Sequence, residues 1–466
     1  QLGRNHDAIE SFQEATLWNK EFPEAHYNMG WLYQELGETD NALDQYEKVV
    51  NFEPDNLDAH FQIGEIHESL RLYQKASSAF QNVVDINPEF VEGHVRLGWN
   101  YAKQDRPKEA LAEFEMALQI NPNLEETYYQ LGITYGELGR FEEGLEALQN
   151  SRRLNPDHLE TLLQLGKFNS ILGNYQEANK YLNLTRKIAP NSSSEMGLLS
   201  GKSLAQMNQF EQALPHLKKA VMQNPDSFDA QFYLGLSLIR LNRPAEAIAP
   251  YLKAVKINPE SSETFNHLGQ TYQKLKMYPE AIAAFNQAIR IEPDFTDAYN
   301  QLGTIYTFQQ DYEMALKIFQ QAVRSNPKFQ TGYYNIGMVY EILGRHSEAI
   351  KQYKKILTLN PDNQKALLSL GWSLMDENRF IEAIPPLKRS ISLNPDYTDA
   401  HYTLGLAYSK LNHFKKAREQ YQLVLKKDPN HSGAYEKLAL VQKELEKETV
   451  APNESFPKEL DIILLP

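Results

Sequence analysis

The stretch with the most suggestive spacing for chemistry is Gly201-Lys202-Ser203, in the middle of the chain. A phosphate-binding loop has the pattern G-x-x-x-x-G-K-[ST], in which backbone N–H groups and the lysine hold the phosphates of a nucleotide. This pattern requires a glycine at position 196, but that residue is Met196, and Gly197 stands one place too close. No strand is predicted before the segment. The spacing therefore argues against a nucleotide site.

Other patterns of catalytic and metal sites are absent from the sequence. Neither H-E-x-x-H, a helical zinc pattern, nor G-x-S-x-G, the pattern of a nucleophilic serine, occurs in the chain. The 466 residues include no cysteine, which excludes disulfides, thiolate catalysis and cysteine-ligated metals. No histidine and carboxylate share a metal-binding spacing. We therefore expect a non-enzymatic chain with no catalytic residue, no cofactor and no metal.

Composition and charge narrow the class of partner. Hydrophobic residues make up 42% of the chain and charged residues 23%, which is typical of a soluble chain that folds. The formal net charge of −14 argues against nucleic acid or an anionic membrane as the main partner. No run of eighteen apolar residues could span a membrane. The sequence begins QLGRNHDAIE without a methionine, so we expect more chain upstream, and the compartment stays open.

Three series of residues recur along the chain with a period of 34 residues, interrupted by one step of 35. The first consists of prolines at 54, 88, 122, 156, 190, 225, 259, 293, 327, 361, 395 and 429. The second consists of glycines at 30, 64, 98, 132, 166, 201, 235, 269, 303, 337, 371 and 405. The third is alanine at 42 and at each following repeat, with Gly144 as the exception. Three series in one phase over twelve cycles indicate an internal repeat.

Each repeat has the pattern of two helices, which we name helix A and helix B and number from Pro23 as position 1 of the first complete repeat. In residues 398–431, apolar residues recur at helical spacing on both sides of Asn412. Glycine or asparagine often stands at this place and tolerates the left-handed conformation that closes a helix, while the proline at position 32 stops helix B. We expect the glycine at position 8 of helix A to face the alanine at position 20 of helix B.

The repeat supplies the reason for Gly201. This glycine belongs to the position 8 series, so we expect it to be a close-packing residue within a helix rather than part of a nucleotide site. Glycine inside a helix costs about 1 kcal/mol relative to alanine, which is tolerated where a side chain would collide with a neighbour. The single 35-residue step, from Pro190 to Pro225, predicts a slightly longer turn at Asn191–Ser194.

Small residues at positions 8 and 20, aromatic residues at 11 and 24 and proline at 32 make the chain similar to a long, bacterial-type tetratricopeptide repeat (TPR) array. The resemblance implies an all-α fold, a right-handed superhelical solenoid of antiparallel helix pairs in which helix A lines a concave surface. We assign residues 1–22 to the second helix of a truncated repeat and 23–431 to twelve tandem repeats. Residues 432–448 are predicted as a C-terminal capping helix, and 449–466 as a proline-containing tail, disordered or docked on a surface.

The aromatic residues at positions 11 and 24 keep the repeat period, which indicates core packing rather than contacts with a cofactor. Four histidines also share one place, position 4, where other repeats have tyrosine or phenylalanine; they are His26, His60, His94 and His401. We expect these histidines to be packing residues of helix A.

In the TPR family, positions 2, 5, 9, 12 and 13 of helix A tend to line the concave groove. Here positions 5 and 9 do not match the lysine and asparagine clamp of chaperone-binding members, and position 6 does not carry the asparagine ladder of O-linked N-acetylglucosamine transferases. What remains is a groove rich in aromatic residues, which are typical anchors for a protein partner. The candidate partner-binding residues are Tyr27, Trp31, Phe61, Trp99, Tyr129, Phe232, Tyr334, Trp372 and Tyr402.

The predicted function is a scaffold that organises or assembles a larger multiprotein complex through its curved surface. Between Arg345 and Lys427 there are 14 Lys and Arg against 8 Asp and Glu, a charge of +6, so the remainder carries −20. This asymmetry would allow successive copies to associate head to tail. Two alternatives stay open: the TPR region of a larger enzyme such as a glycosyltransferase, and a chaperone-like adaptor that binds a peptide.

Overall fold

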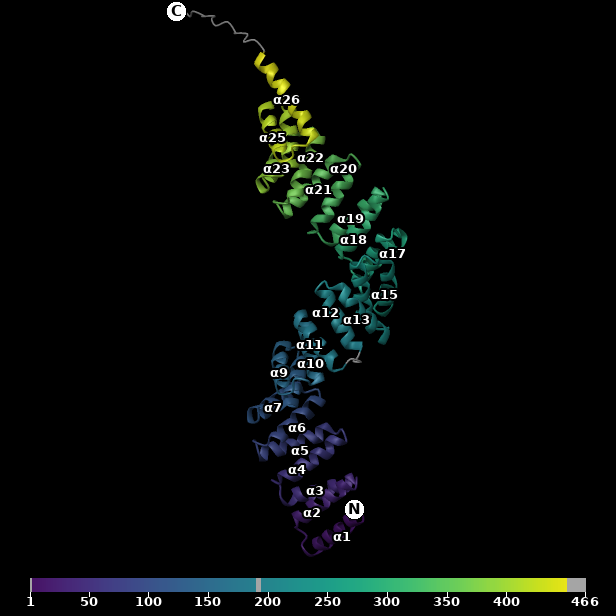
Figure 1. Ribbon diagram of the computed structural model, residues 1–466, viewed down its shortest axis with the longest axis vertical. Coiled ribbons are helices and arrows are strands. Elements are labelled where there is room, and N and C mark those ends of the chain that lie inside the picture. Colours follow the sequence, from purple (N-terminus) through teal and green to yellow (C-terminus); the bar gives the residue numbers. More distant parts are fainter. Residues whose placement is uncertain (1, 190–193, 451–466) are drawn as a thin grey trace, which may run out of the picture. The chain divides into compact units, whose positions relative to one another are not determined.

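The computed structural model describes residues 2–189 and 194–450 of the chain, which form helices joined by short turns and contain no strand (Figure 1). The chain divides into two compact units, residues 1–242 and 243–466, and each is described by itself. The all-α prediction is confirmed for the described residues. The predicted longer turn before Glu195 lies outside them except for Ser194, which begins a helix, and so does most of the predicted tail.

The N-terminal unit begins with α1 (Leu2–Trp18), within the segment predicted as a truncated repeat, and continues with pairs of helices. Its helices A are α2 (Pro23–Glu35), α4 (Leu57–Ser69), α6 (Val91–Lys103), α8 (Glu125–Glu137), α10 (Leu159–Ile171), α12 (Ser194–Gln206) and α14 (Phe228–Arg240). Its helices B are α3 (Thr39–Phe52), α5 (Tyr73–Ile86), α7 (Pro107–Ile120), α9 (Phe141–Leu154), α11 (Tyr175–Ile188) and α13 (Phe210–Gln223). Each helix packs on the next, as the stacked ribbons of Figure 1 show.

The C-terminal unit repeats the same order from α15 (Pro244–Ile257) onward. Its helices A are α16 (Ser262–Lys274), α18 (Thr296–Phe308), α20 (Gln330–Ile342), α22 (Gln364–Asp376) and α24 (Thr398–Lys410). Its further helices B are α17 (Tyr278–Ile291), α19 (Tyr312–Ser325), α21 (His346–Leu359), α23 (Phe380–Leu393) and α25 (Phe414–Lys427). The last helix, α26 (Ser432–Val450), covers the segment predicted as a cap and packs on α25, with Ala434 and Val441 buried.

The turn between helix A and helix B has the same backbone conformation in both units. Its residue at position 15 has a positive φ, such as +77° at Gly37 and 59° at Asn412, which is the left-handed conformation expected there. Arg71, Lys276 and Gln310 adopt it as well, although their side chains do not favour it. The packing of the helix pair therefore imposes this turn even where the local sequence does not.

The position 8 glycines make room for the residue at position 24 of helix B, and in some repeats they also face the backbone of position 20, as expected: a Cβ atom on Gly98 would lie 3.2 Å from the carbonyl oxygen of Ala110. A Cβ atom on Gly30 would lie 2.8 Å from Cε1 of Tyr46, and one on Gly371 would lie 2.5 Å from Cδ2 of Leu387. Cβ atoms essentially never approach so closely in real proteins. The alanines at position 20 are also fully buried, Ala42 among them. Large side chains at position 24 thus fill the space between helix A and helix B, and glycine at position 8 leaves room for them because it has no side chain.

Candidate functional site

The Gly201-Lys202-Ser203 stretch lies inside α12, as predicted for a packing glycine. A Cβ atom on Gly201 would lie 2.5 Å from Cγ of Leu217, so helix B requires the missing side chain. The ammonium group of Lys202 lies 3.4 Å from Oδ2 of Asp229 and 5.3 Å from the ring centre of Tyr233. The lysine therefore faces a carboxylate and an aromatic ring of the next helix A, which is no arrangement for holding a phosphate.

The position 4 histidines are packing residues that join each helix A to its surroundings by hydrogen bonds. His94 lies 2.7 Å from Oε2 of Glu113 through Nδ1 and 2.9 Å from the carbonyl oxygen of Pro88 through Nε2. His401 repeats this geometry with Gln420 and Pro395. Both ring nitrogens are used within the fold, which confirms the structural role expected for these side chains.

The candidate aromatic residues of the N-terminal unit lie on helices A, but their exposure differs. Trp31 in α2 is the most open, with 52% of its surface exposed, whereas Phe232 in α14 is buried. Tyr27, Phe61, Trp99 and Tyr129 are half-buried. Of this set, Trp31 offers the most apolar surface to a partner, and Phe232 offers the least.

The half-buried rings contact core residues of their own repeat or, for Trp99, a residue of the preceding repeat. Tyr27 stands edge-on to Tyr46, with 5.4 Å between ring centres, and Phe61 stands edge-on to Phe80 at 5.5 Å. Trp99 has Tyr73 at 5.8 Å on one side and the ammonium of Lys103 at 5.0 Å. These contacts fix the orientation of each ring, so that its remaining surface would meet a partner with little loss of side-chain entropy.

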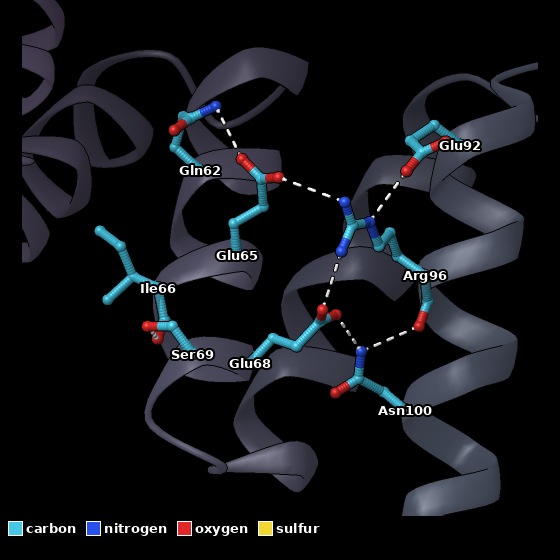
Figure 2. Close-up of polar contacts among 8 residues, drawn as sticks. All are labelled: Gln62, Glu65, Ile66, Glu68, Ser69, Glu92, Arg96 and Asn100. Carbon is cyan, nitrogen blue, oxygen red and sulfur yellow. Dashed lines mark hydrogen bonds and ion pairs between the residues drawn. The ribbon is translucent and has the colours of Figure 1, made fainter. Parts of the chain in front are cut away.

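On α4 and α6, the helices that carry Phe61 and Trp99, charged side chains form a network around Arg96 (Figure 2). The guanidinium of Arg96 lies 2.8 Å from Glu68, 2.8 Å from Glu92 and 3.7 Å from Glu65. Asn100 donates to the other carboxylate oxygen of Glu68 at 2.7 Å. One arginine therefore faces three carboxylates, which leaves the network with an excess of negative charge.

Besides partial burial, the excess of negative charge contributes to a raised pKa of Glu65. Partial burial raises it above the ordinary value of 4.5, and Glu68 and Glu92 raise it further, although Arg96 and a hydrogen bond from Gln62 lower it. Additional positive charge beside Glu65 would favour the ionised carboxylate. The sequence alone does not predict this network, because Glu68 and Arg96 stand in different repeats and meet only when one helix A stacks on the next.

A second group of charged residues gathers where α8 meets α10. Glu125, Glu126 and His158 each have an atom that could bind a metal ion, and these atoms lie within 4.8 Å of one another. The spacing of these residues in the sequence did not predict this arrangement. His158 Nδ1 lies 2.7 Å from Oγ1 of Thr161 and 2.9 Å from Oε1 of Glu125, and its Nε2 lies 3.2 Å from Oε2 of Glu160. Both nitrogens of the histidine thus already face polar groups of the chain.

In the C-terminal unit, Tyr334, Trp372 and Tyr402 are half-buried residues of α20, α22 and α24. The rings of Trp372 and Tyr402 are neighbours, with 6.5 Å between their centres, and Tyr402 also lies 4.8 Å from His431. Tyr334 lies 5.8 Å from the buried Tyr353. The structure therefore brings two of the three predicted residues together on adjacent helices A.

Each unit is thus a stack of helix pairs, and its helices A carry the aromatic and charged side chains described above. The chain belongs to the tetratricopeptide repeat family, whose models match residues 23–56, 57–90, 91–124, 129–193, 198–262, 262–295, 296–329, 331–363 and 374–440. Proteins of this family bind other proteins or peptides. Among the described residues, no helix has the length and apolar character needed to cross a membrane.

Several solved structures are similar to the chain. YrrB, described as a TPR protein with an unusual peptide-binding site, is 21% identical over 40% of this chain and 95% of its own, with a TM-score of 0.36. MamA from Desulfovibrio magneticus RS-1 is 26% identical over 37% of this chain and 96% of its own, at 0.34. The APC/C hetero-tetramer Cut9–Hcn1 is 14% identical over 94% of both chains, at 0.36. A comparison with curated proteins gave no match.

Proposed function

We propose that the chain organises a larger multiprotein complex, without catalysing a reaction, by binding partner proteins on its helices A. The repeat family supports the general role of a protein-interaction scaffold. The proposal adds that several partner subunits are held by the one chain, because helices A of twelve repeats offer many separate contact positions.

The observation that carries the proposal is the exposure of Trp31. A tryptophan with 52% of its surface in water is an unfavourable choice for a side chain that only packs within its own repeat. Other repeats place Glu65, Lys167 or Gln270 at the same position 9, so the fold does not require an aromatic residue there. Large, rigid aromatic side chains of this kind often supply much of the energy of protein–protein association.

Charge supports a partner with a basic surface at the N-terminal unit. Along α2, α4 and α6, the side chains around the aromatic residues include more carboxylates than basic groups; the carboxylates are Glu24, Glu35, Asp58, Glu65, Glu68 and Glu92, and the basic groups are Arg96 and Lys103. Opposite charges across an interface mainly increase the association rate and the selectivity for the right partner. An acidic surface with aromatic anchors therefore suits a partner segment that carries Lys and Arg beside apolar residues.

Native purification tests the proposal. The full chain, tagged and expressed in its own cell, is purified gently at low and moderate salt, and its partners are identified by mass spectrometry. The proposal predicts stable co-purification with large protein partners in defined ratios, with binding that weakens as salt rises. A chain that elutes as a free monomer under all these conditions contradicts it.

A further inference from the structure

Two consecutive repeats in the C-terminal unit break the pattern of position 13, the last residue of helix A. Nine of the twelve repeats carry a polar or charged residue there: Glu35, Ser69, Lys103, Glu137, Gln206, Arg240, Lys274, Asp376 and Lys410. The exceptions are Ile171, which stands alone, and the adjacent pair Phe308 and Ile342. Because nine repeats fold with polar residues at this position, packing within the repeat does not explain the apolar pair.

The apolar pair lies on the surface. Phe308 at the end of α18 is 71% exposed, Ile342 at the end of α20 is 52% exposed, and Met338, one turn before Ile342, is 42% exposed. These side chains line a hollow of about 290 Å³ whose floor includes Phe319 of α19. This volume is at the lower limit for small-molecule pockets, so it suits one or two side chains of a peptide better than a cofactor.

One amide side chain, that of Asn335, lines the hollow, and it is held by the neighbouring Asn300. Asn335 donates through Nδ2 to Oδ1 of Asn300 at 2.7 Å, which links α20 to α18. Thr304 and Thr307 lie on the α18 side. The pair of asparagines leaves further amide hydrogens and lone pairs that match the donors and acceptors of an extended peptide backbone. The hollow thus joins an apolar floor to a neutral polar rim.

No charged side chain lines this hollow among the described residues. A lysine or a carboxylate brought into it would lose its hydration without gaining a counter-charge, which is strongly unfavourable. Buried leucine, isoleucine or methionine side chains would instead remove apolar surface of Phe308, Met338 and Ile342 from water. The complementary ligand is therefore uncharged at its centre, in contrast to the basic partner that suits the N-terminal unit.

We propose that the hollow between α18 and α20 binds an extended, uncharged segment of a partner protein through a large aliphatic side chain. This inference rests on the proposed scaffold function and adds a second class of partner contact to it. The aliphatic side chain fills the hollow, and the backbone on either side of it bonds to Asn300 and Asn335. A competing occupant is the chain's own segment Ile462–Leu465, which lies outside the described residues.

The repeat itself supplies variants that preserve the fold. Phe308→Lys imports the residue that position 13 carries in Lys103, Lys274 and Lys410, and Ile342→Asp imports that of Asp376. Both side chains are more than half exposed, so we expect the double variant to fold and melt like the wild type. Ile171→Lys is the matched control, because Ile171 is 51% exposed at position 13 in α10, far along the sequence from the hollow.

The probe is a pool of twelve-residue peptides in which one central leucine is flanked only by Gly, Ser, Thr, Asn and Gln. Binding is followed by the ¹³C signals of the methionine methyl groups, nine in all, with Met338 assigned through Met338→Leu. We expect the Met338 signal to shift and the affinity to fall at least tenfold in the double variant but not in Ile171→Lys. Replacing the central leucine by lysine should weaken binding at least tenfold as well.

Four results would overturn the proposal: no shift of the Met338 signal, equal affinity in the double variant, equal affinity for the lysine pool, or tighter binding of a peptide with residues 451–466. The outcome is separable from that of the scaffold function. If the double variant still co-purifies with every partner of the wild type and the pool fails to bind, the scaffold stands and the role of the hollow is wrong. If the peptide pool binds but no complex purifies, the hollow binds peptides as proposed and the scaffold function is wrong.

Discussion

Gly64 in α4 faces the ring of Phe80 in α5 so closely that an added Cβ would lie 2.6 Å from Cε1 of the ring. By helix propensity alone, Gly64→Ala would stabilise the chain by about 1 kcal/mol. We expect the opposite, a loss of about 1–3 kcal/mol, because Phe80 is fully buried and has nowhere to move. Urea unfolding monitored by circular dichroism measures the sign, and a stabilised Gly64→Ala variant would show that the close contact is wrong.

Gly37 provides the control for this prediction. Its φ is +77° and nothing lies within 4 Å of the place of a Cβ, so its role is backbone conformation rather than close packing. Asn208, Asn242, Asn378 and Asn412 adopt the same conformation in other repeats. Gly37→Asn should therefore change the unfolding free energy by no more than about 0.5 kcal/mol.

His67 makes the N-terminal unit sensitive to acid. Burial and the nearby Lys75 lower the pKa of this histidine below its ordinary 6.5, while Glu47 acts weakly in the other direction. The unfolded chain then binds the proton more readily, so stability is complete above about pH 6.5 and falls as the pH drops below that value. Position 11 holds tyrosine in many repeats, as in Tyr33 and Tyr101.

We therefore predict that His67→Tyr stabilises the chain by up to about 1 kcal/mol more at pH 5.5 than at pH 8. The measurement is a urea midpoint at both pH values for the wild type and the variant. An equal change at the two pH values would show that His67 does not titrate in the unfolding reaction.

Arg96 compensates the carboxylates on α4 and α6, and its removal should cost more than the loss of an ordinary surface pair. We predict that Arg96→Met destabilises the chain by about 1 kcal/mol at pH 8 and by less at pH 4.5, where Glu65 takes up a proton. The sign follows from the raised pKa of Glu65, which disfavours the ionised form in the folded state, so that its cost appears as the pH rises through 4.5.

Lys48→Met is the matched control for Arg96, because Lys48 forms one exposed pair with Asp44 at 2.6 Å. Such pairs contribute little, so a loss below about 0.5 kcal/mol is expected at both pH values. Unfolding measured at several salt concentrations should also show a stronger salt dependence for the Arg96 variant than for the control. Equal effects of the two substitutions would mean that the network around Arg96 contributes no more to stability than an ordinary exposed ion pair.

The sequence predicts the helix pairs, their turns and the role of Gly201, because each depends on residues within one repeat. It does not predict that Arg71 or Lys276 adopts a left-handed turn, since tertiary packing overrides the local preference there. It also does not predict that the side chain at position 24 lies nearest to the position 8 glycines, because spacing alone does not give the rotation of one helix about another. The Glu68–Arg96 contact joins two repeats, and only the stacking of helices A brings these residues together. Glu125 and His158 are the first and last residues of one repeat, and they meet only because the chain turns back on itself between them.

The assignment of binding residues stays a prediction, and the structure ranks its members. Trp31, half in water, is a better candidate than the buried Phe232, whose substitution would first affect folding. We expect Trp31→Ala to lower the melting temperature by less than Phe232→Ala does, because 52% of the Trp31 surface is already in water in the folded state. Differential scanning calorimetry checks this, and a large drop would show that Trp31 is needed for the fold.

The most direct test of the scaffold account compares three tagged chains purified from the native cell: the wild type, Trp31→Ala and Trp18→Ala. Trp18 is 93% exposed at the end of α1 and lies on none of the helices A, so it controls for the loss of an exposed tryptophan. The account predicts that the wild type and Trp18→Ala bring down the same large partners, and that Trp31→Ala loses at least one of them. Identical partners for all three chains, or no partner for any, would contradict it.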